Sequence, residues 1–344
     1  MGKKYKNLFE KIIDIDNLRD AYKKATKGNR YTTSHLKFKE NLEANLFMLQ
    51  KKLIDDTYVH GDYTSFIVYE PKKREISALP FKDRVVQHAI NNIISPIFEK
   101  TFYPCSFACR KNKGTHNGVK AVQSTIRKLE KNGEVFFLKM DFRKYFHSIS
   151  LNILFKEMER KISDTKTLNL IKKFSNEGVG IKIGNLLSQL QANIYGHIFD
   201  RFIKTKLKVK NYFRYMDDTV ILSNDKNILI EYQAKLQLFS KIFLKLEFSK
   251  WQIANLKNKL LNFLGYRISG AFKLIRKSSI IKAKRKIKFF AKRNLIDKLL
   301  IFLASWRSHL LLADSWNLKK FILFKEEELW KNKLICRSST VLLN

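Results

Sequence analysis

The sequence is poor in the residues that mark domain linkers and disulfide or zinc frameworks. Its 344 residues include four prolines and twelve glycines, and these do not gather into a linker between independent domains. Three cysteines, Cys105, Cys109 and Cys336, form neither a paired disulfide framework nor a four-ligand zinc pattern. We therefore expect subdomains without separating linkers, in a reducing intracellular compartment.

Long apolar runs are also missing. Segments such as LLIFLASW at 299–306 are far too short to span a bilayer. The first sixteen residues lack the apolar core and the cleavage site of a signal peptide. Lys6 stands where a myristoylation signal needs Ser or Thr. We expect a cytoplasmic protein with no membrane among its partners.

Acidic residues are scarce. The chain carries 31 Asp and Glu against 68 Lys and Arg, which gives a formal net charge of +37 at pH 7. With 45% hydrophobic and 13% aromatic residues, the composition is that of a folded protein and not of a disordered basic tail. A field of this size favours a polyanionic partner, either nucleic acid or an anionic membrane surface. Because the apolar runs are so short, nucleic acid is the leading expectation.

Hydrophobic periodicity predicts both helices and strands along the chain. Helical spacing covers residues 8–55, 81–98 and 226–244, and a long helix is expected from about Leu187. The other expected elements are two short strands around a basic turn at 71–73, a strand ending on Asp141, a helix over 151–162 with Ser150 as its N-cap, strand-like segments at 246–253 and 262–268, and basic helices from Arg276. Helices and strands do not alternate strictly, which argues for an α+β fold.

Two adjacent acids interrupt the apolar segment FRYMDDTVIL at 213–222. Asp217 and Asp218 are expected at the tip of a hairpin, and Asp141 ends another predicted strand. If the strands are neighbours at the usual ~4.8 Å spacing, these carboxylates converge. Converging acids repel one another unless divalent cations lie among them, and hard oxygen ligands suit Mg²⁺. Two ions roughly 3.5–4 Å apart would serve in-line phosphoryl transfer; the alternative is that the aspartates merely favour a turn.

Several short motifs accompany the acids in one order. YMDD at 215–218, DFRKYF at 141–146 and FLGY at 263–266 resemble the signatures of reverse transcriptases, and residues 70–90 resemble their fingers motifs. The resemblance implies an α+β right-hand polymerase fold with fingers, a palm whose antiparallel sheet is backed by helices, and a helical thumb. The implied limits are N-terminal helices and fingers at 1–133, a palm at 134–266 with a motif B helix at 184–204, and a basic thumb at 267–344.

The motif between the two acidic ones narrows the resemblance. Residues 183–195, IGNLLSQLQANIY, have the form I-G-x-x-x-S-Q in place of the common Pro-Gln-Gly. This form is similar to the reverse transcriptases of diversity-generating retroelements, as are KNLFEKI at 6–12, SFACRKNKGTHNGV at 106–119 and FLASWRSH at 302–309. The chain departs from that group at Gln191, where an aromatic is usual, and at His147, where proline is common. Both departures concern template contact and not the metal ligands.

The resemblance assigns roles to the acids and their neighbours. Asp141 and Asp217 hold two Mg²⁺ ions, for which Mn²⁺ is a possible substitute, and Asp218 is a weaker ligand. The carbonyl of Phe142 completes one coordination shell. Lys250 is expected to protonate the leaving pyrophosphate as a general acid, although an ordinary surface lysine is the alternative there.

The resemblance also implies contacts with substrates. The expected deoxynucleoside triphosphate (dNTP) contacts are Lys72, Arg74, Phe142, Phe146, Ile181 and Gln189. Arg74 offers a planar fork for phosphate, and the ring of Phe146 would exclude a 2′-hydroxyl unless it is only a core aromatic. The expected template–primer contacts are Gly184, Ser188, Tyr215, Met216, the primer grip of Phe263, Leu264, Gly265 and Tyr266, and the thumb residues Lys284 and Arg285, which would meet phosphates unless they form a solvated face.

The function implied by the resemblance is RNA-directed DNA polymerase activity. Within the retroelement group this means copying a structured template RNA into cDNA, with errors at template adenines that feed mutagenic retrohoming. The implied partners are the template RNA, the RNA–cDNA duplex, dNTPs and a small basic accessory variability protein that forms an oligomeric barrel. Two alternatives stay open: a retron, group II intron-like or phage-defence reverse transcriptase, and a non-catalytic RNA-binding protein on a polymerase fold.

Overall fold

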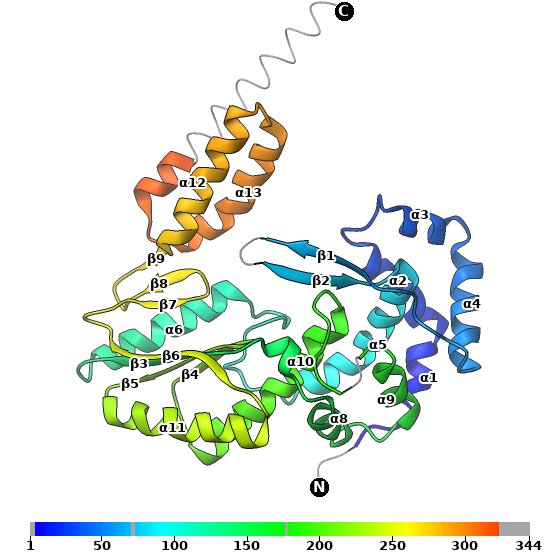
Figure 1. Ribbon diagram of the computed structural model, residues 1–344, viewed down its shortest axis with the longest axis horizontal. Helices are drawn as coiled ribbons and strands as arrows, with labels where there is room; N and C mark the ends of the chain where they lie inside the picture. The colour runs from blue at the N-terminus through cyan, green and yellow to red at the C-terminus, as the bar shows by residue number, and fades with distance from the viewer. Residues whose placement is uncertain (1–3, 70–72, 176–177, 323–344) are drawn as a thin grey trace, which may run out of the picture. The chain divides into compact units, whose positions relative to one another are not determined.

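The computed structural model describes residues 4–69, 73–175 and 178–322 of the chain (Figure 1). Lys72 lies outside the described residues. The helices are α1 (Leu8–Ile13), α2 (Ile15–Thr26), α3 (Thr33–Glu40), α4 (Leu42–Ile54), α5 (Phe81–Glu99), α6 (Thr115–Glu130), α7 (Tyr145–Ser148), α8 (Leu151–Glu159), α9 (Thr165–Lys172), α10 (Leu186–Arg201), the π-helix η1 (Phe202–Lys206), α11 (Lys226–Phe243), α12 (Lys277–Lys292) and α13 (Ile296–Leu312). The strands are β1 (Thr64–Val68), β2 (Arg74–Ala78), β3 (Phe136–Phe142), β4 (Tyr212–Tyr215), β5 (Asp218–Ser223), β6 (Phe248–Asn255), β7 (Leu261–Phe263), β8 (Tyr266–Ile268) and β9 (Lys273–Ile275).

The chain divides into two compact units, each made of separate stretches. The first unit contains residues 1–112, 140–219 and 231–251, and the second contains 113–139, 220–230 and 252–344. The helix and strand content confirms the expected α+β class. The contiguous limits expected for fingers, palm and thumb stay a prediction. Among the described residues, no helix combines the length and the apolar character that a bilayer crossing needs.

In the first unit, α5 lies at the centre of the N-terminal helices. Its apolar residues recur at helical spacing, and Val85, Ala89 and Ile90 are fully buried. The facing helix α2 contributes Leu18 and Ala21, also fully buried, and packs directly on α5. The helical spacing expected over 8–55 and 81–98 is confirmed, because α1 to α4 and α5 occupy those ranges.

A β-hairpin follows the N-terminal helices in the first unit. Strands β1 and β2 pair antiparallel from Thr64 opposite Ala78 to Val68 opposite Arg74. All five residues of β1 are exposed, so this hairpin is held to the unit by β2. The Ser77 amide donates to the carbonyl oxygen of Ile183 at 2.8 Å. The two expected strands are therefore confirmed, and the hairpin is tied to the loop before α10.

The acids lie on neighbouring strands of one sheet. Its strand order is β4-β5-β3-β6 (Figure 1). Met216 and Asp217 connect β4 to β5, and Met216 adopts a left-handed conformation with φ of 55°. This arrangement confirms the expected hairpin at the Asp pair. β3, which carries Asp141, is the neighbour of β5, so the condition under which the carboxylates would converge is met.

Two local expectations need correction. The segment 262–268 is not one strand but a tight hairpin, in which β7 and β8 pair antiparallel around Leu264 and Gly265. Both turn residues have positive φ, 52° and 88°, as a two-residue hairpin turn requires. The helix expected over 151–162 ends at Glu159, and Ser150 occupies its N-cap position without a side-chain capping bond.

The second unit includes α6, the small sheet β7-β8-β9 and the basic helices α12 and α13. α13 packs on α12 and on β9, and its Leu299, Leu303 and Leu310 are buried. The Tyr266 hydroxyl donates to the carbonyl oxygen of His309 at 3.1 Å, which ties the small sheet to α13. The helices expected from Arg276 are confirmed.

Candidate active site

Asp141 and Asp217 come together where their strands end. Asp141 is the penultimate residue of β3, and the amide of Phe142 donates to the carbonyl oxygen of Asp217 at 3.4 Å. The pKa of the Asp217 carboxyl is raised, first by burial and then by the negative charge of Asp141 and a side-chain hydrogen bond with it. The charge of Arg74 opposes this rise. The structure thus brings two acids and one predicted phosphate-binding cation to one place.

The donor set fits a divalent cation that shares its coordination with a substrate. A pair of half-buried carboxylates in which the charge of one raises the pKa of the other is stabilised by a cation placed between them. Among the described residues, no group of three or more His, Cys, Asp or Glu side chains is placed to enclose a metal ion by itself. Mg²⁺ does not need such a cage, because it commonly binds one or two carboxylates together with substrate phosphates. Asp141 and Asp217 are two of the three acids expected to converge. The third, Asp218, is half-buried and is the first residue of β5.

Aromatic side chains pack around Phe142, the residue that follows Asp141. Phe142 is buried, and its ring stacks on Phe248 at 4.5 Å and on Tyr145 at 5.6 Å between centroids. The Tyr145 hydroxyl donates to the carbonyl oxygen of Ala192 in α10 at 2.8 Å. The ring of Phe142 is therefore committed to the core, and only its backbone remains for the ligand role that was expected. Phe146 is half-buried and meets Tyr145 edge-on at 6.0 Å.

Hydrogen bonds connect the loop before α10 to the elements around the acids. The amide of Gly180 donates to Ile149, and that of Ile181 to Phe146, each at 2.8 Å. On its other side, the loop accepts the bond from Ser77 already described. Asn185 donates its side-chain amide to the hydroxyl of Tyr63 at 3.1 Å. These bonds connect the hairpin that carries Arg74 with the segment that carries Phe146.

Burial separates the expected catalytic, dNTP and template–primer residues into two groups. Arg74, Gln189, Lys250, Lys284 and Arg285 are exposed, and Tyr215 is half-buried. Side chains almost closed off from solvent are Ile181 (2%), Ser188 (2%), Met216 (8%), Phe263 (0%) and Tyr266 (1%). The Ile181 side chain packs inside the protein, so in this structure only its backbone is available for the expected dNTP contact. The closed-off residues can offer only backbone atoms in this structure.

The predicted residues do not all fall in one unit. The first unit holds the acids, Arg74, Phe142, Phe146, the loop and α10 residues, Tyr215, Met216 and Lys250, whereas Phe263 to Tyr266, Lys284 and Arg285 belong to the second. Lys250 lies on β6, the neighbour of β3 in the sheet. The preceding Ser249 donates its hydroxyl to the carbonyl oxygen of Asp141 at 3.1 Å. Gln191, one of the two departures noted in the sequence, is buried and bonds to Ser175 at 3.2 Å.

Gly184 packs tightly against the hairpin. A Cβ at this position would lie 2.7 Å from the carbonyl oxygen of Ser77 and 2.8 Å from the Cγ2 atom of Ile76, and the φ of Gly184 is +118°. In the structure, Gly184 therefore closely approaches the protein's own backbone, and its contact with template–primer stays a prediction. The glycine is needed whether or not a nucleotide lies nearby.

Replacing Gly184 with alanine should destabilise the protein by about 1–3 kcal/mol, because backbone atoms must shift to admit the methyl group. Urea unfolding of the two proteins measures the difference. Gly133→Ala is the matched control, because Gly133 has a similar φ of +125° and no atom within 4 Å of the added methyl group. Equal losses in the two variants would show that backbone strain alone, and not crowding against the hairpin, makes Gly184 necessary.

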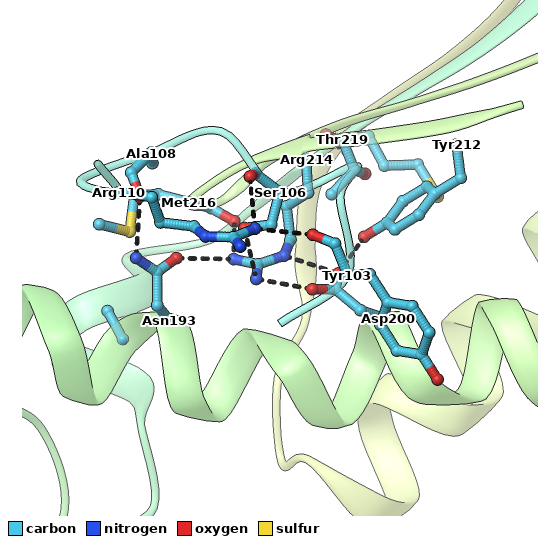
Figure 2. A network of polar contacts seen from close by, with 12 residues as sticks. Tyr103, Ser106, Ala108, Arg110, Asn193, Asp200, Tyr212, Arg214, Met216 and Thr219 are labelled. Atoms are coloured by element: carbon cyan, nitrogen blue, oxygen red, sulfur yellow. Dashed lines mark hydrogen bonds and ion pairs between the residues drawn. The ribbon is translucent and has the colours of Figure 1, made fainter. Parts of the chain in front are cut away.

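Sequence reasoning missed a buried network beside the turn of Met216 and Asp217, the candidate catalytic turn. Arg214 in β4 and Asp200 in α10 are both fully buried and form an ion pair at 2.7 Å. The hydroxyl of Tyr212 donates to the same carboxylate at 2.8 Å. Figure 2 shows these side chains converging between the helix and the strand. No local pattern singles out Arg214 or Asp200, because α10 carries several other polar residues and Arg201 directly follows Asp200.

One family model and several curated proteins match this chain. Residues 69–268 match the family model described as "Reverse transcriptase (RNA-dependent DNA polymerase)". The protein YkfC of Escherichia coli (strain K12) is 25% identical over 183 residues, which is 48% of each chain. The group II intron-encoded protein LtrA of Lactococcus lactis subsp. cremoris is 31% identical over 150 residues, 40% of this chain and 24% of the relative. The chain therefore matches less than half the length of these curated relatives.

A likeness in structure supports the polymerase fold. The apo telomerase of Candida tropicalis superposes with a TM-score of 0.51, covering 82% of this chain and 59% of the telomerase chain. The sequence identity is 13%, so this likeness concerns the fold alone.

Proposed function

The chain belongs to the reverse transcriptase (RNA-dependent DNA polymerase) family, and from this premise we propose that it synthesises DNA on an RNA template from deoxynucleoside triphosphates. The observation that carries the proposal is the contact between Asp141 and Asp217 with the charge of Arg74 acting on it. A decayed, purely RNA-binding relative would have no reason to keep a repelling acid pair at this place.

The acids and Arg74 divide the work of nucleotidyl transfer. Bound Mg²⁺ ions would activate the primer 3′-hydroxyl and neutralise charge on the leaving pyrophosphate. Asp141 and Asp217 hold the negative charge that binds them, and Asp218 adds to it. Arg74, exposed on β2, offers a fork of N–H donors to the triphosphate. Lys250, exposed on the neighbouring strand, is the proposed proton donor to the pyrophosphate.

The remaining side chains position the nucleotide and the nucleic acid. The ring of Phe146, in the short helix α7 that follows β3, excludes a 2′-hydroxyl from the sugar site. Gln189, exposed in the first turn of α10, contacts the nascent base pair. In the second unit, the β7–β8 turn holds the primer end through its backbone. The exposed Lys284 and Arg285 of α12 contact duplex phosphates.

A narrower assignment within the family is a diversity-generating retroelement. The I-G-x-x-x-S-Q form of residues 183–189 supports it, together with the similar segments near both ends of the chain. In this assignment the protein copies a structured RNA with errors at adenines and works with a small basic accessory protein. A second candidate is a group II intron-like reverse transcriptase, and the similarity to an intron-encoded protein supports it.

One experiment tests the family function and the assignment together. The purified protein is given Mg²⁺, dNTPs and either a primed homopolymer RNA or the noncoding RNA encoded beside its gene, with and without the neighbouring small basic protein. We expect cDNA on both templates, and substitutions concentrated opposite adenines on the adjacent RNA. Errors spread evenly over the four template bases would refute the retroelement assignment and leave the polymerase intact. No extension on any template would refute the polymerase itself.

A further inference from the structure

Arg214 occupies a fully enclosed position next to the catalytic turn. Its side chain and that of Asp200 are both 0% exposed. The Nε atom of Arg214 donates to Asp200 Oδ1 and the Nη2 atom to Oδ2, each at 2.7 Å. This is the bidentate geometry that holds a guanidinium in one orientation. A carboxylate on α10 therefore determines where the rest of the arginine fork points.

The free edge of that fork reaches the turn that carries Asp217. The Nη1 atom of Arg214 donates to the carbonyl oxygen of Met216 at 3.4 Å and to Asn193 Oδ1 at 3.5 Å. The Nη2 atom also donates to Ser106 Oγ at 3.1 Å. Met216 is the turn residue with φ of 55°, directly before Asp217. Figure 2 shows the guanidinium between Asp200 on the helix and Met216 in the turn.

The backbone of Arg214 is fixed as firmly as its side chain. β4 is the edge strand of its sheet, and the segment around Ser106 covers that edge. The amide of Arg214 donates to Cys105, and its carbonyl oxygen accepts from the amide of Phe107, each at 2.9 Å. Arg110 braces this segment by donating to the carbonyl oxygen of Ser106 at 2.9 Å. The arginine therefore cannot follow the turn if the turn shifts.

The helix leaves a space of matching shape for the guanidinium. A Cβ at Gly196 in α10 would lie 2.4 Å from Arg214 Nη1, 2.6 Å from its Cζ and 3.0 Å from the hydroxyl of Tyr145. The guanidinium would have to move to admit this Cβ, yet hydrogen bonds to Asp200, Ser106 and Met216 hold it in place. A glycine inside a helix is normally unfavourable relative to alanine. Its presence here admits Arg214 to the one position from which it reaches Met216.

We propose that the Asp200–Arg214 pair is a positioning device that sets the backbone of the catalytic turn, and with it the carboxylate of Asp217; this inference rests on the proposed polymerase function. Stability alone does not explain the pair, because a buried ion pair can often be replaced by apolar side chains at no cost. What an apolar pair cannot supply is a donor aimed at the Met216 carbonyl. Arg214 touches no substrate and acts only through the turn.

The first test is Arg214→Lys, which keeps the positive charge opposite Asp200 but removes the fork. A lysine cannot bond both carboxylate oxygens and Met216 at once. We expect kcat to fall roughly 10- to 100-fold, as for a small misplacement of a catalytic group. The KM for dNTP and the affinity for template–primer should stay within about threefold of wild type, because the surfaces that bind them are unchanged. An unchanged kcat would overturn the proposal.

The second test separates positioning from folding. The double variant Asp200→Asn with Arg214→Met removes both charges and keeps an acceptor for the Tyr212 hydroxyl. If the pair were only structural, this folded, neutral variant would polymerise like wild type. Positioning predicts a kcat as low as that of Arg214→Lys. Gly196→Ala should lower kcat in the same way, despite the better helix propensity of alanine.

A third test uses a measurement that does not need polymerase activity. Hydrogen exchange of the amides at residues 215–218 is compared among wild type, Arg214→Lys and the double variant, with the amides of α5 as internal reference. We expect faster exchange at the turn in both variants and no change in α5. Unchanged exchange at the turn would overturn the positioning role. If the turn exchanges faster in both variants but the wild-type protein extends no primer, the proposed function is refuted and the positioning role is kept.

Discussion

Replacing Asp217 with asparagine should lower RNA-templated DNA synthesis by roughly 100- to 1,000-fold, as loss of a main electrostatic stabiliser does. Asparagine keeps the shape of the side chain but removes the charge that, together with Asp141, would bind the divalent cations. The measurement is single-nucleotide primer extension at saturating dNTP. Because Asp217 is paired with a repelling neighbour that raises its pKa, the substitution removes a source of strain, and the protein should stay folded.

The matched control for this result is Asp16→Asn on α2. Asp16 pairs with Arg19, and its side chain is 81% exposed, so its loss should leave both folding and extension unchanged. Template–primer affinity should also survive in Asp217→Asn, since the basic surface binds phosphates without the acids. Persistence of normal extension in Asp217→Asn would remove the metal-binding assignment of the acid pair.

Replacing Phe146 with alanine should relax the choice between deoxy- and ribonucleotides by roughly 10- to 200-fold, the range over which a pocket discriminates a small added group. The backbone of Phe146 is held by its bond from Ile181, and its ring leans edge-on against Tyr145. These two contacts hold the Phe146 ring in place close to Asp141 in the sequence. Removing it opens room for a 2′-hydroxyl without disturbing the acids.

The quantity to measure is the ratio of kcat/KM for a dNTP to that for the matching ribonucleotide. Phe243→Ala on α11 is the control, because this phenylalanine is 61% exposed and its loss removes a similar ring from the surface. A ratio that stays at the wild-type value in Phe146→Ala would show that the ring belongs to the core and not to the sugar site.

Local features of the chain were predictable because they depend on neighbouring residues. The α5 helix and the hairpin at Asp217 follow from periodicity and from apolar runs on either side of the acids. The β7–β8 hairpin was missed, since its turn requires Leu264 to adopt positive φ and leucine does not signal that. Lys250 and Arg74 were placed from the resemblance, and the structure leaves both exposed.

The sequence by itself determined the class of fold, the strands that flank the acids and the family to which the chain belongs, because apolar spacing and short motifs are properties of adjacent residues. Only the tertiary structure decided which of the predicted contacts are accessible and what holds the catalytic turn in place. Ile181 is buried, Gly184 meets Ser77, and Asp200 meets Arg214 through the packing of a helix on a strand. Such contacts join segments that no local pattern relates, so their partners become known only when the chain is folded.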